Sequence, residues 1–503
     1  MVTLSLQYPQ MPFLFLGFIA VFVFMAARIF KISNVSMALI TALSFLLVFF
    51  YMIFESYLLQ IVSHSFSDFH NNLSRLFSSS AFYKYEPGAI LISLITLGLA
   101  FLVSIFCAEY LNLDHRQHAF YPLLILMICG LIGMLFSANL MVLYLFCELM
   151  SICAYSLVAF RRRTDTAIEA GFKYLMMGSA ASIVILLGIT LLFLSIGSIN
   201  INDMQGSTSW PAQIGVLMFF SGFCLKSALV PMHTWLPDAH GRAPSSISAI
   251  LSGILVQGVF YVMLKITLSL GFDQILLGTI LLYLALLNVV VGNLMGLAQS
   301  HTKRLLGYST IAQMGYIVLC MAVGLRNNLP IALQAGFFII ISHAVAKSLA
   351  FLSKGIFHYY VDASEIKHLQ RASNLPLFPS MAFSLSIVSL SALPPFPGFT
   401  GKFFALTGFF TSTDKITVLS AFIFLAGSLV AFGYYFPLLL ILFSKPEKKE
   451  SAEKERRNQK KISIWMSMPL GVLVISIIFI SIAPQYLMGI TMEAAQFLMG
   501  LTR

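Results

Sequence analysis

Five ionisable side chains lie inside or beside long apolar runs of this 503-residue chain. They are Glu148, Lys226, His343, Lys347 and Lys402. An ionised side chain is costly within a bilayer and normally faces a protein interior or a water-filled cavity. A buried lysine near a carboxylate suits proton handling, because burial favours the neutral amine and the carboxylate favours the ammonium form. These residue types therefore predict a proton relay inside a membrane.

Lys354 and His233 form a second rank of candidates. His343 and Lys347 are four residues apart and share a helical face, and Lys354 lies seven residues further along it. His233 follows a proline in a turn-like segment and could be a loop histidine. Snorkelling to a membrane surface is the alternative for Lys354 and Lys402. A purely structural buried ion pair is the alternative for the more central charges.

The elements that carry these residues follow from the composition. The chain is 59% hydrophobic and 10% charged, whereas a soluble domain carries about 25% charge. A soluble globule and a disordered chain are therefore excluded. Continuous apolar runs predict an all-α polytopic membrane protein with about fourteen transmembrane helices of roughly 20 residues each, rather than a β-barrel. We place their centres near Phe18, Leu43, Leu97, Met127, Met150, Leu186, Met218, Leu255, Leu284, Val318, Ile341, Ile387, Leu429 and Ile477.

The orientation follows from the basic loops. Lys and Arg gather after odd-numbered spans, most of all at 445–461, which holds six Lys, two Arg and four Glu. Because basic loops stay in the cytoplasm, we expect both termini outside a plasma membrane, bacterial or archaeal. The net charge of +11 is then a topology signal rather than a sign of nucleic-acid binding. Lys173 and Lys265, near span ends, are expected to be snorkelling anchors.

Two apolar runs are interrupted by proline, at 226–237 (KSALVPMHTWLP) and 393–402 (LPPFPGFTGK). The breaking residues are Pro231, Pro237, Pro394, Pro395 and Pro397. Proline removes a helical hydrogen bond, so each run predicts a discontinuous helix. The first breaker precedes the second by 163 or 164 residues and by five spans, which indicates two inverted five-helix repeats, a transporter pattern. The predicted units are 1–118 (helices 1–3), 119–270 (first repeat), 271–444 (second repeat) and 445–503 (basic loop and last helix).

The motifs around these breakers resemble a known family. The run KSALVPMHTWLPDAH (226–240), followed by APSSISAILSG (243–253), is very similar to antiporter-like membrane subunits. Such subunits occur in respiratory complex I (NADH:quinone oxidoreductase), Mrp-type cation/proton antiporters and membrane-bound hydrogenases. The runs KRLLGYSTIAQMGY (303–316), HAVAKSLAFLSKG (343–355) and 394–402 extend the resemblance over roughly 120–445.

The resemblance implies roles for individual residues. Glu148 corresponds to the family's span-five glutamate, Lys226 to its broken-helix partner and Lys347 to the central lysine. Lys402 corresponds to the terminal residue of the path, and His343 to a polar link. A departure is Gln257, where many relatives have a lysine or histidine; glutamine can hold a water wire but cannot carry a proton.

The sequence thus predicts an ion-translocating subunit, most simply for protons but also compatible with Na⁺, within a multisubunit membrane complex. On this resemblance, the lack of a long lateral helix disfavours the longest complex I member, and a lysine at 402 disfavours the member with a glutamate there. An Mrp-type or hydrogenase-type subunit is then favoured, and the shorter complex I subunits are the other option. A stand-alone cation-coupled transporter of a small solute is the main alternative, and a purely structural subunit is another. No metal, cofactor or nucleophile motif is present in the sequence, so any redox chemistry would lie in partner chains.

Overall fold

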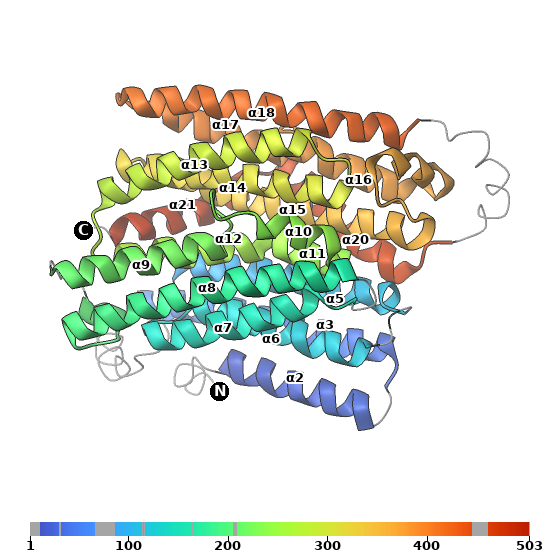
Figure 1. Cartoon of the computed structure of the whole chain (residues 1–503), viewed down its shortest axis with the longest axis horizontal. Helices are drawn as coiled ribbons and strands as arrows, with labels where there is room; N and C mark the ends of the chain where they lie inside the picture. Colours follow the sequence, from blue (N-terminus) through green and yellow to red (C-terminus); the bar gives the residue numbers. More distant parts are fainter. Residues whose placement is uncertain are drawn as a thin grey trace.

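The structure is a computed structural model that describes residues 11–29, 32–65, 86–112, 114, 116–161, 165–204, 209–444 and 461–501. These residues form an elongated bundle whose helices run largely side by side (Figure 1). The first part contains α2 (Met11–Ile29), α3 (Asn34–Ser65), α5 (Pro87–Tyr110), α6 (Gln117–Leu135), α7 (Leu140–Val158), α8 (Asp165–Ile196), a 3₁₀ turn (Ile201–Met204) and α9 (Trp210–Lys226). The basic run predicted as a cytoplasmic loop lies outside the described residues, except for Lys461.

The remaining elements continue the bundle. They are α10 (Trp235–Arg242), α11 (Ser245–Ile250), a π-helical turn η2 (Leu251–Leu255), α12 (Val256–Ser269), α13 (Gln274–Leu297), α14 (Thr302–Arg326), α15 (Pro330–Val361), a 3₁₀ segment η3 (Ile366–Asn374), α16 (Leu377–Leu390), α17 (Pro397–Phe410), α18 (Lys415–Leu442), α20 (Ile464–Ile482) and α21 (Gln485–Gly500). Within the described residues, β structure is limited to two isolated bridges, Asn139–Asn200 and His301–Glu365.

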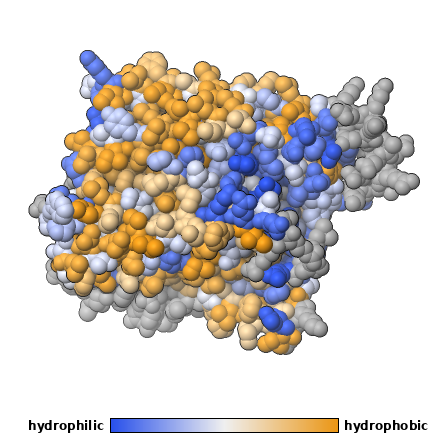
Figure 2. All heavy atoms as spheres, in the orientation of Figure 1, coloured by the Kyte–Doolittle hydropathy of each residue, from blue (hydrophilic) through white to orange (hydrophobic). Residues whose placement is uncertain are grey.

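The predicted fold class is confirmed, because each of the fourteen predicted span centres falls inside a helical segment. Eleven helices of the described part are long and apolar enough to cross a membrane, and shorter apolar helices accompany them. Much of the surface in Figure 2 is apolar, and hydrophilic residues gather toward one end. Large apolar side chains such as Leu194 on α8 and Leu429 on α18 are exposed, as suits a lipid-facing surface.

Three elements form the centre of the bundle. The helical stretch 245–269 is fully buried, and α14 and α15 are 94% buried over their most apolar windows. A helix that is buried on all sides has no face toward water or lipid, so any charge on it faces the protein interior. Polar side chains on these three elements must therefore meet other parts of this chain, and Gln257, His343 and Lys347 all lie on them.

Both predicted discontinuous helices are present. The first consists of α9 and α10, separated by 227–234, and the second of α16 and α17, separated by 391–396. Pro231, Pro394 and Pro395 lie within the breaks. Pro397 is instead the first residue of α17 and Pro237 lies in the first turn of α10. Proline is tolerated in a first turn because those N–H groups have no helical partner.

The two breaks have the same backbone conformation and the same pattern of backbone hydrogen bonds where the first half-helix ends. The segments SALVP (227–231) and SALPP (391–395) match in four of five letters at a spacing of 164 residues. Ala228 and Ala392 both have a positive φ, at 54° and 57°, a conformation that costs alanine about 1 kcal/mol. In each copy the next N–H reaches five residues back, from Leu229 to the Cys224 carbonyl and from Leu393 to the Val388 carbonyl. This is the Schellman helix end, and its repetition supports the internal repeat.

The second break constrains Gly398 on α17. A Cβ built on Gly398 would collide with the backbone carbonyl oxygen of Ser389. We expect Gly398→Ala to lower the free energy of unfolding by about 1–3 kcal/mol, because the two half-helices must move apart. Thermal unfolding of the detergent-solubilised protein measures this. Gly98→Ala on α5 is the matched control, since nothing lies within 4 Å of its added Cβ; equal midpoints for both variants would contradict the prediction.

Candidate functional site

An ion pair lies at the first break, with Lys226 buried and Glu148 about a quarter exposed. Lys226 is the last residue of α9 and only 5% exposed, and its Nζ lies 3.3 Å from Glu148 Oε1 on α7. The same Nζ donates to Ser151 Oγ at 2.8 Å, and Ser182 on α8 donates to Glu148 Oε1. The negative end of the α9 dipole stabilises a cation at this position. Glutamate and lysine thus share a polar site made by three helices.

Aromatic packing holds the start of α10 against this site. The Trp235 ring stacks on Tyr174 of α8 with centroids 4.1 Å apart, and its Nε1 donates to the Leu225 carbonyl at 3.0 Å. That carbonyl lies one residue before Lys226, at the end of α9, and also accepts from the Ala228 N–H at 3.1 Å. Trp235 therefore fixes the break and, through it, the position of the lysine.

The second group lies at the centre of the bundle. The Gln257 Nε2 on α12 lies within hydrogen-bonding distance of His343 Nδ1 on α15. The same Nε2 donates to the Ser252 carbonyl at 3.1 Å, inside the π-helical turn η2. Ser252 also shares a hydroxyl hydrogen bond of 2.6 Å with Thr310 of α14. The glutamine therefore links α15 to the π-helical turn, and Ser252 links that turn to α14. Such turns are often found at functional sites.

Lys347 forms the third group. It is fully buried, and its Nζ donates to the Leu306 carbonyl at 2.8 Å and to the Ser309 hydroxyl, both on α14. Ser309 begins a polar row on α14 that continues with Gln313 and Tyr316, at helical spacings of four and three. Gln313 donates to the Leu390 carbonyl at the end of α16, so the row reaches the second break.

Lys402 on α17 is the fourth group. Its Nζ lies 3.9 Å from the centroid of the Tyr316 ring and donates to Ser428 on α18 at 3.0 Å. The Tyr316 hydroxyl accepts from Asn293 of α13 at 3.1 Å. Lys402 is 5% exposed, so it does not snorkel. A lysine above an aromatic face keeps a favourable partner without a carboxylate.

Sequence reasoning missed several polar members of this arrangement. The row Ser309, Gln313, Tyr316 has a readable helical spacing, but its serine and glutamine are common in apolar helices. His240 was missed because 233–240 resembles a loop after the break. In the structure α10 turns back into the bundle, and the His240 ring is fully buried, 5.1 Å from the Phe351 ring. Neither ring nitrogen has a hydrogen-bond partner among the described residues.

The second-rank candidates have different positions. Lys354 is buried and donates to the Ala363 carbonyl just beyond its own helix, so it neither snorkels nor contacts the other candidates directly. His233 lies within the first break, with Nδ1 3.3 Å from the Pro231 carbonyl. The expectation for Lys265 is wrong: it is 2% exposed and pairs with Glu86, because α5 and α6 cover this end of α12. His301, in the loop before α14, has a pKa lowered to about 4 by burial and then by Lys303.

A charged pocket of about 140 Å³ lies beside α10. It contains Asp238, which pairs with Lys173 of α8 at 3.5 Å and with Arg304 of α14 at 3.3 Å. Lys173 is half exposed there and also pairs with Glu169. At the repeat spacing of 164 residues, Asp238 occupies the position that Lys402 has in the second copy. The two repeats thus place their charges differently around the same backbone break.

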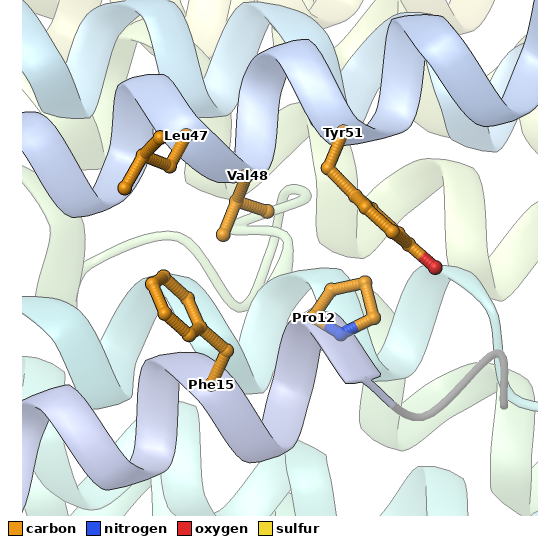
Figure 3. A pocket seen from close by; sticks show the side chains of 5 residues that line it. All are labelled: Pro12, Phe15, Leu47, Val48 and Tyr51. Atoms are coloured by element: carbon orange, nitrogen blue, oxygen red, sulfur yellow. The ribbon is translucent and has the colours of Figure 1, made fainter. Parts of the chain in front are cut away.

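An apolar groove of about 400 Å³ lies between α2 and α3, away from both breaks (Figures 1 and 3). Its described lining consists of Pro12, Phe15, Leu47, Val48 and Tyr51, whose side chains face one another across the space. No lysine, histidine or carboxylate is among these lining residues. The groove therefore does not belong to the buried charge arrangement.

The fold and its buried charges define a polytopic membrane protein with two broken helices and ionisable side chains between them. Residues 137–431 match the family described as NADH:quinone oxidoreductase/Mrp antiporter, transmembrane part. The chain is 30% identical to NADH-quinone oxidoreductase subunit N 2 of Syntrophobacter fumaroxidans over 418 residues, covering 81% of this chain and 84% of the relative. The chain belongs to this family of antiporter-like membrane subunits.

Solved structures show the same fold. The archaeal membrane-bound sulfane sulfur reductase contains a chain with a TM-score of 0.79 and 21% identity, covering 97% of this chain and 96% of that one. The Mrp complex from Dietzia sp. DQ12-45-1b contains another, with a TM-score of 0.70 and 18% identity, covering 97% and 99%. These likenesses extend over both repeats and the flanking helices.

The packing of Trp235 is open to a graded test. Trp235→Ala should lower the free energy of unfolding by about 3–5 kcal/mol, because it removes a stacked ring from a filled site. Trp235→Phe should cost roughly 1 kcal/mol if it retains the stacking and loses only the hydrogen bond to Leu225. Thermal unfolding of the solubilised protein ranks the two variants. An equal loss of stability in both would refute the stacking role.

Proposed function

We propose that this chain is a proton-translocating subunit of a multisubunit membrane complex. Protons move along a path that begins at Glu148 and Lys226, crosses the Gln257–His343 junction, and continues through Lys347 to Lys402. The driving reaction belongs to partner subunits, since the relatives are named as subunits of larger complexes. The basic loops support an orientation with both termini outside.

The observation that carries the proposal is the Glu148–Lys226 pair at the end of a broken helix. A structural ion pair needs no helix break, and replacing such a pair with apolar residues is often neutral or stabilising. Here Lys226 also contacts Ser151, and Glu148 accepts from Ser182, so each charge has a second polar contact. A proton transferred between the two leaves neutral groups that still have hydrogen-bond partners.

The groups are separate, and water is the natural connection between them. Among the described residues no direct hydrogen bond joins Lys226, His343, Lys347 and Lys402 to one another. Buried polar atoms that have no hydrogen-bond partner in the described part of the chain include both ring nitrogens of His240 and the Nε2 atom of His343. Buried atoms of this kind bind ordered water. We infer a path in which side chains hold protons and water carries them between groups.

The residue types favour H⁺ over Na⁺. A sodium site requires several oxygen ligands, as hard cations do in general. Glu148 is the single carboxylate among the proposed path residues, and the other ionisable members are lysines and a histidine. Ammonium and imidazolium groups exchange protons but repel metal cations, so the second half of the path suits protons alone.

The type of complex is a separate question. Curated relatives at 27–30% identity carry the name NADH-quinone oxidoreductase subunit N, which does not support the preference for an Mrp or hydrogenase type drawn from Lys402. We infer a respiratory or antiporter complex and expect membrane subunits of that complex to copurify with a tagged chain. Mass spectrometry of the purified assembly identifies them. A chain that purifies alone and takes up a solute in liposomes would instead support the stand-alone transporter.

Lys226→Ala and Glu148→Gln test the proton path. We expect each to reduce proton translocation by roughly tenfold or more, because a loss of about 1.4 kcal/mol of barrier stabilisation already has that effect. The measurement is fluorescence quenching of a pH-sensitive dye in vesicles that contain the whole complex, driven by its own reaction. Subunit composition on native gels shows whether the complex is intact.

Lys367→Ala is the matched control, because Lys367 lies in the connecting segment η3 with an exposed side chain that pairs with Glu365. It should pump as the unaltered complex does. Normal pumping by the Lys226→Ala complex would refute the path. If Glu148→Gln lowers the amount of assembled complex, while each assembled complex pumps normally, the result would favour the purely structural subunit.

A further inference from the structure

A second polar line leaves the Gln257–His343 junction along α12. Gln257, Tyr261 and Lys265 follow one another at intervals of four residues, so they share one face of the helix. Each is at most 2% exposed. The line runs toward the end of α12, the face of the bundle at which α5 begins, and away from Lys347 on the neighbouring helix. The proposed path makes no use of Tyr261 or Lys265.

Lys265 ends this line in a buried ion pair. Its Nζ lies 3.1 Å from Glu86 Oε2 and donates to the Leu135 carbonyl, the last of α6, at 2.7 Å. Both side chains are nearly inaccessible, at 2% and 3% exposed. The Leu135 carbonyl lies at a helix end and lacks a helical partner. The lysine thus remains within the protein, where transfer from water is costly for both charges.

The Glu86 side chain pairs with Lys265 and does not cap its own helix. It is the N-cap residue of α5 but makes no side-chain capping hydrogen bond. In contrast, Asn139, Asp273 and Asp414 each cap their helices with the side chain. Glu86 Oε2 has no hydrogen bond among the described residues apart from the ionic contact with Lys265. A carboxylate with this spare capacity can take up a proton.

Tyr261 connects the pair with the junction. A Cβ added to Gly88 would lie 2.5 Å from the Tyr261 hydroxyl oxygen, so glycine permits the hydroxyl to rest against the first turn of α5. Gly88 is two residues from Glu86, and Tyr261 is one helical turn from both Gln257 and Lys265. The Tyr261 ring also contacts Phe337 of α15 at a centroid distance of 5.9 Å. The hydroxyl therefore lies against the first turn of α5, near Glu86, while its own residue is one turn of α12 from Gln257.

We propose that Tyr261, Lys265 and Glu86 form a branch of the proton path from the Gln257–His343 junction to the face where α5 begins. The inference rests on the proposed function. Lys265 gives a proton to Glu86, which leaves a neutral amine and a neutral acid. Glu86 releases that proton to water at the face, and Lys265 takes up the next from the Tyr261 hydroxyl.

The tyrosine step is balanced in the same way. As its hydroxyl donates one proton to Lys265, its oxygen accepts another that reaches it from His343 through water. Gln257 positions His343 and carries no proton. A glutamine at this point therefore does not block transfer, because the residues on either side of it hold the proton.

The double variant Glu86→Gln/Lys265→Met tests the branch. Either single variant leaves one buried charge without its partner, which is strongly destabilising, whereas removing both charges together is often tolerated. In the assembled complex we expect the double variant to keep its subunits and its driving reaction. Protons moved per turnover of that reaction should fall because the branch is closed, but should stay above zero because the path through Lys347 and Lys402 remains.

Tyr261→Phe is the second variant, because it removes one hydroxyl and keeps the ring against Phe337. It should also lower the ratio of protons moved to turnovers, without changing assembly or thermal unfolding. This variant decides the question if the double variant does not assemble. A ratio equal to that of the unaltered complex in Tyr261→Phe, or in an assembled double variant, would overturn the branch.

Lys226→Met in the same complex separates this inference from the proposed function. If Lys226→Met abolishes pumping while the double variant pumps fully, the main path stands and the branch is wrong. If Lys226→Met also pumps fully, the proposed function itself is wrong. Abolished pumping in Lys226→Met, together with a lowered ratio in the double variant and in Tyr261→Phe, supports both.

Discussion

The cost of holding an ammonium group away from water governs how this bundle is built. Four lysines in its interior solve the problem in one way, by donating to a backbone carbonyl. They are Lys265, Lys303, Lys347 and Lys354. Three of the four carbonyls lie at or beyond helix ends, where they lack helical partners. A charge and an unpaired carbonyl, each unfavourable when buried alone, therefore satisfy one another, and the lysines can stay inside without a large set of carboxylates.

The two breaks show how one backbone supports two charge arrangements. Both copies end a helix with a positive-φ alanine and a hydrogen bond five residues back. In the first copy the lysine ends the half-helix before the break, where the dipole favours it. At the matching position the second copy has Leu390, and its lysine lies on the half-helix after the break, above an aromatic ring. The repeat thus conserves the interruption, and each copy places its charge separately.

Residue types that are rare in apolar runs could be recognised in the sequence, whereas burial that depends on the packing of distant helices could not. Charged residues and prolines in apolar runs are few, so Glu148, Lys226 and the broken helices could be predicted from their positions. His240 could not, because its burial depends on α10 turning back toward α14 and α15. Lys265 was misjudged for a related reason: a lysine near a span end can snorkel, and the cover that α5 and α6 supply at that end is not visible in the local sequence. The helix α21 after the last predicted span also went unrecognised.

The contacts of Gln257 explain why a glutamine at this position is compatible with the proposed path. Taken alone, a glutamine where the family resemblance implies a lysine or histidine suggests an interrupted path. In the structure its amide binds both His343 and the π-helical turn, so it holds the histidine against that turn, which Ser252 links to α14. Ionisable groups then lie on each side of it, Lys347 one turn beyond the histidine and Lys265 two turns along its own helix. A fixed, uncharged residue between two lysines avoids placing a third cation where no carboxylate contact is described, which is compatible with the histidine role that we propose.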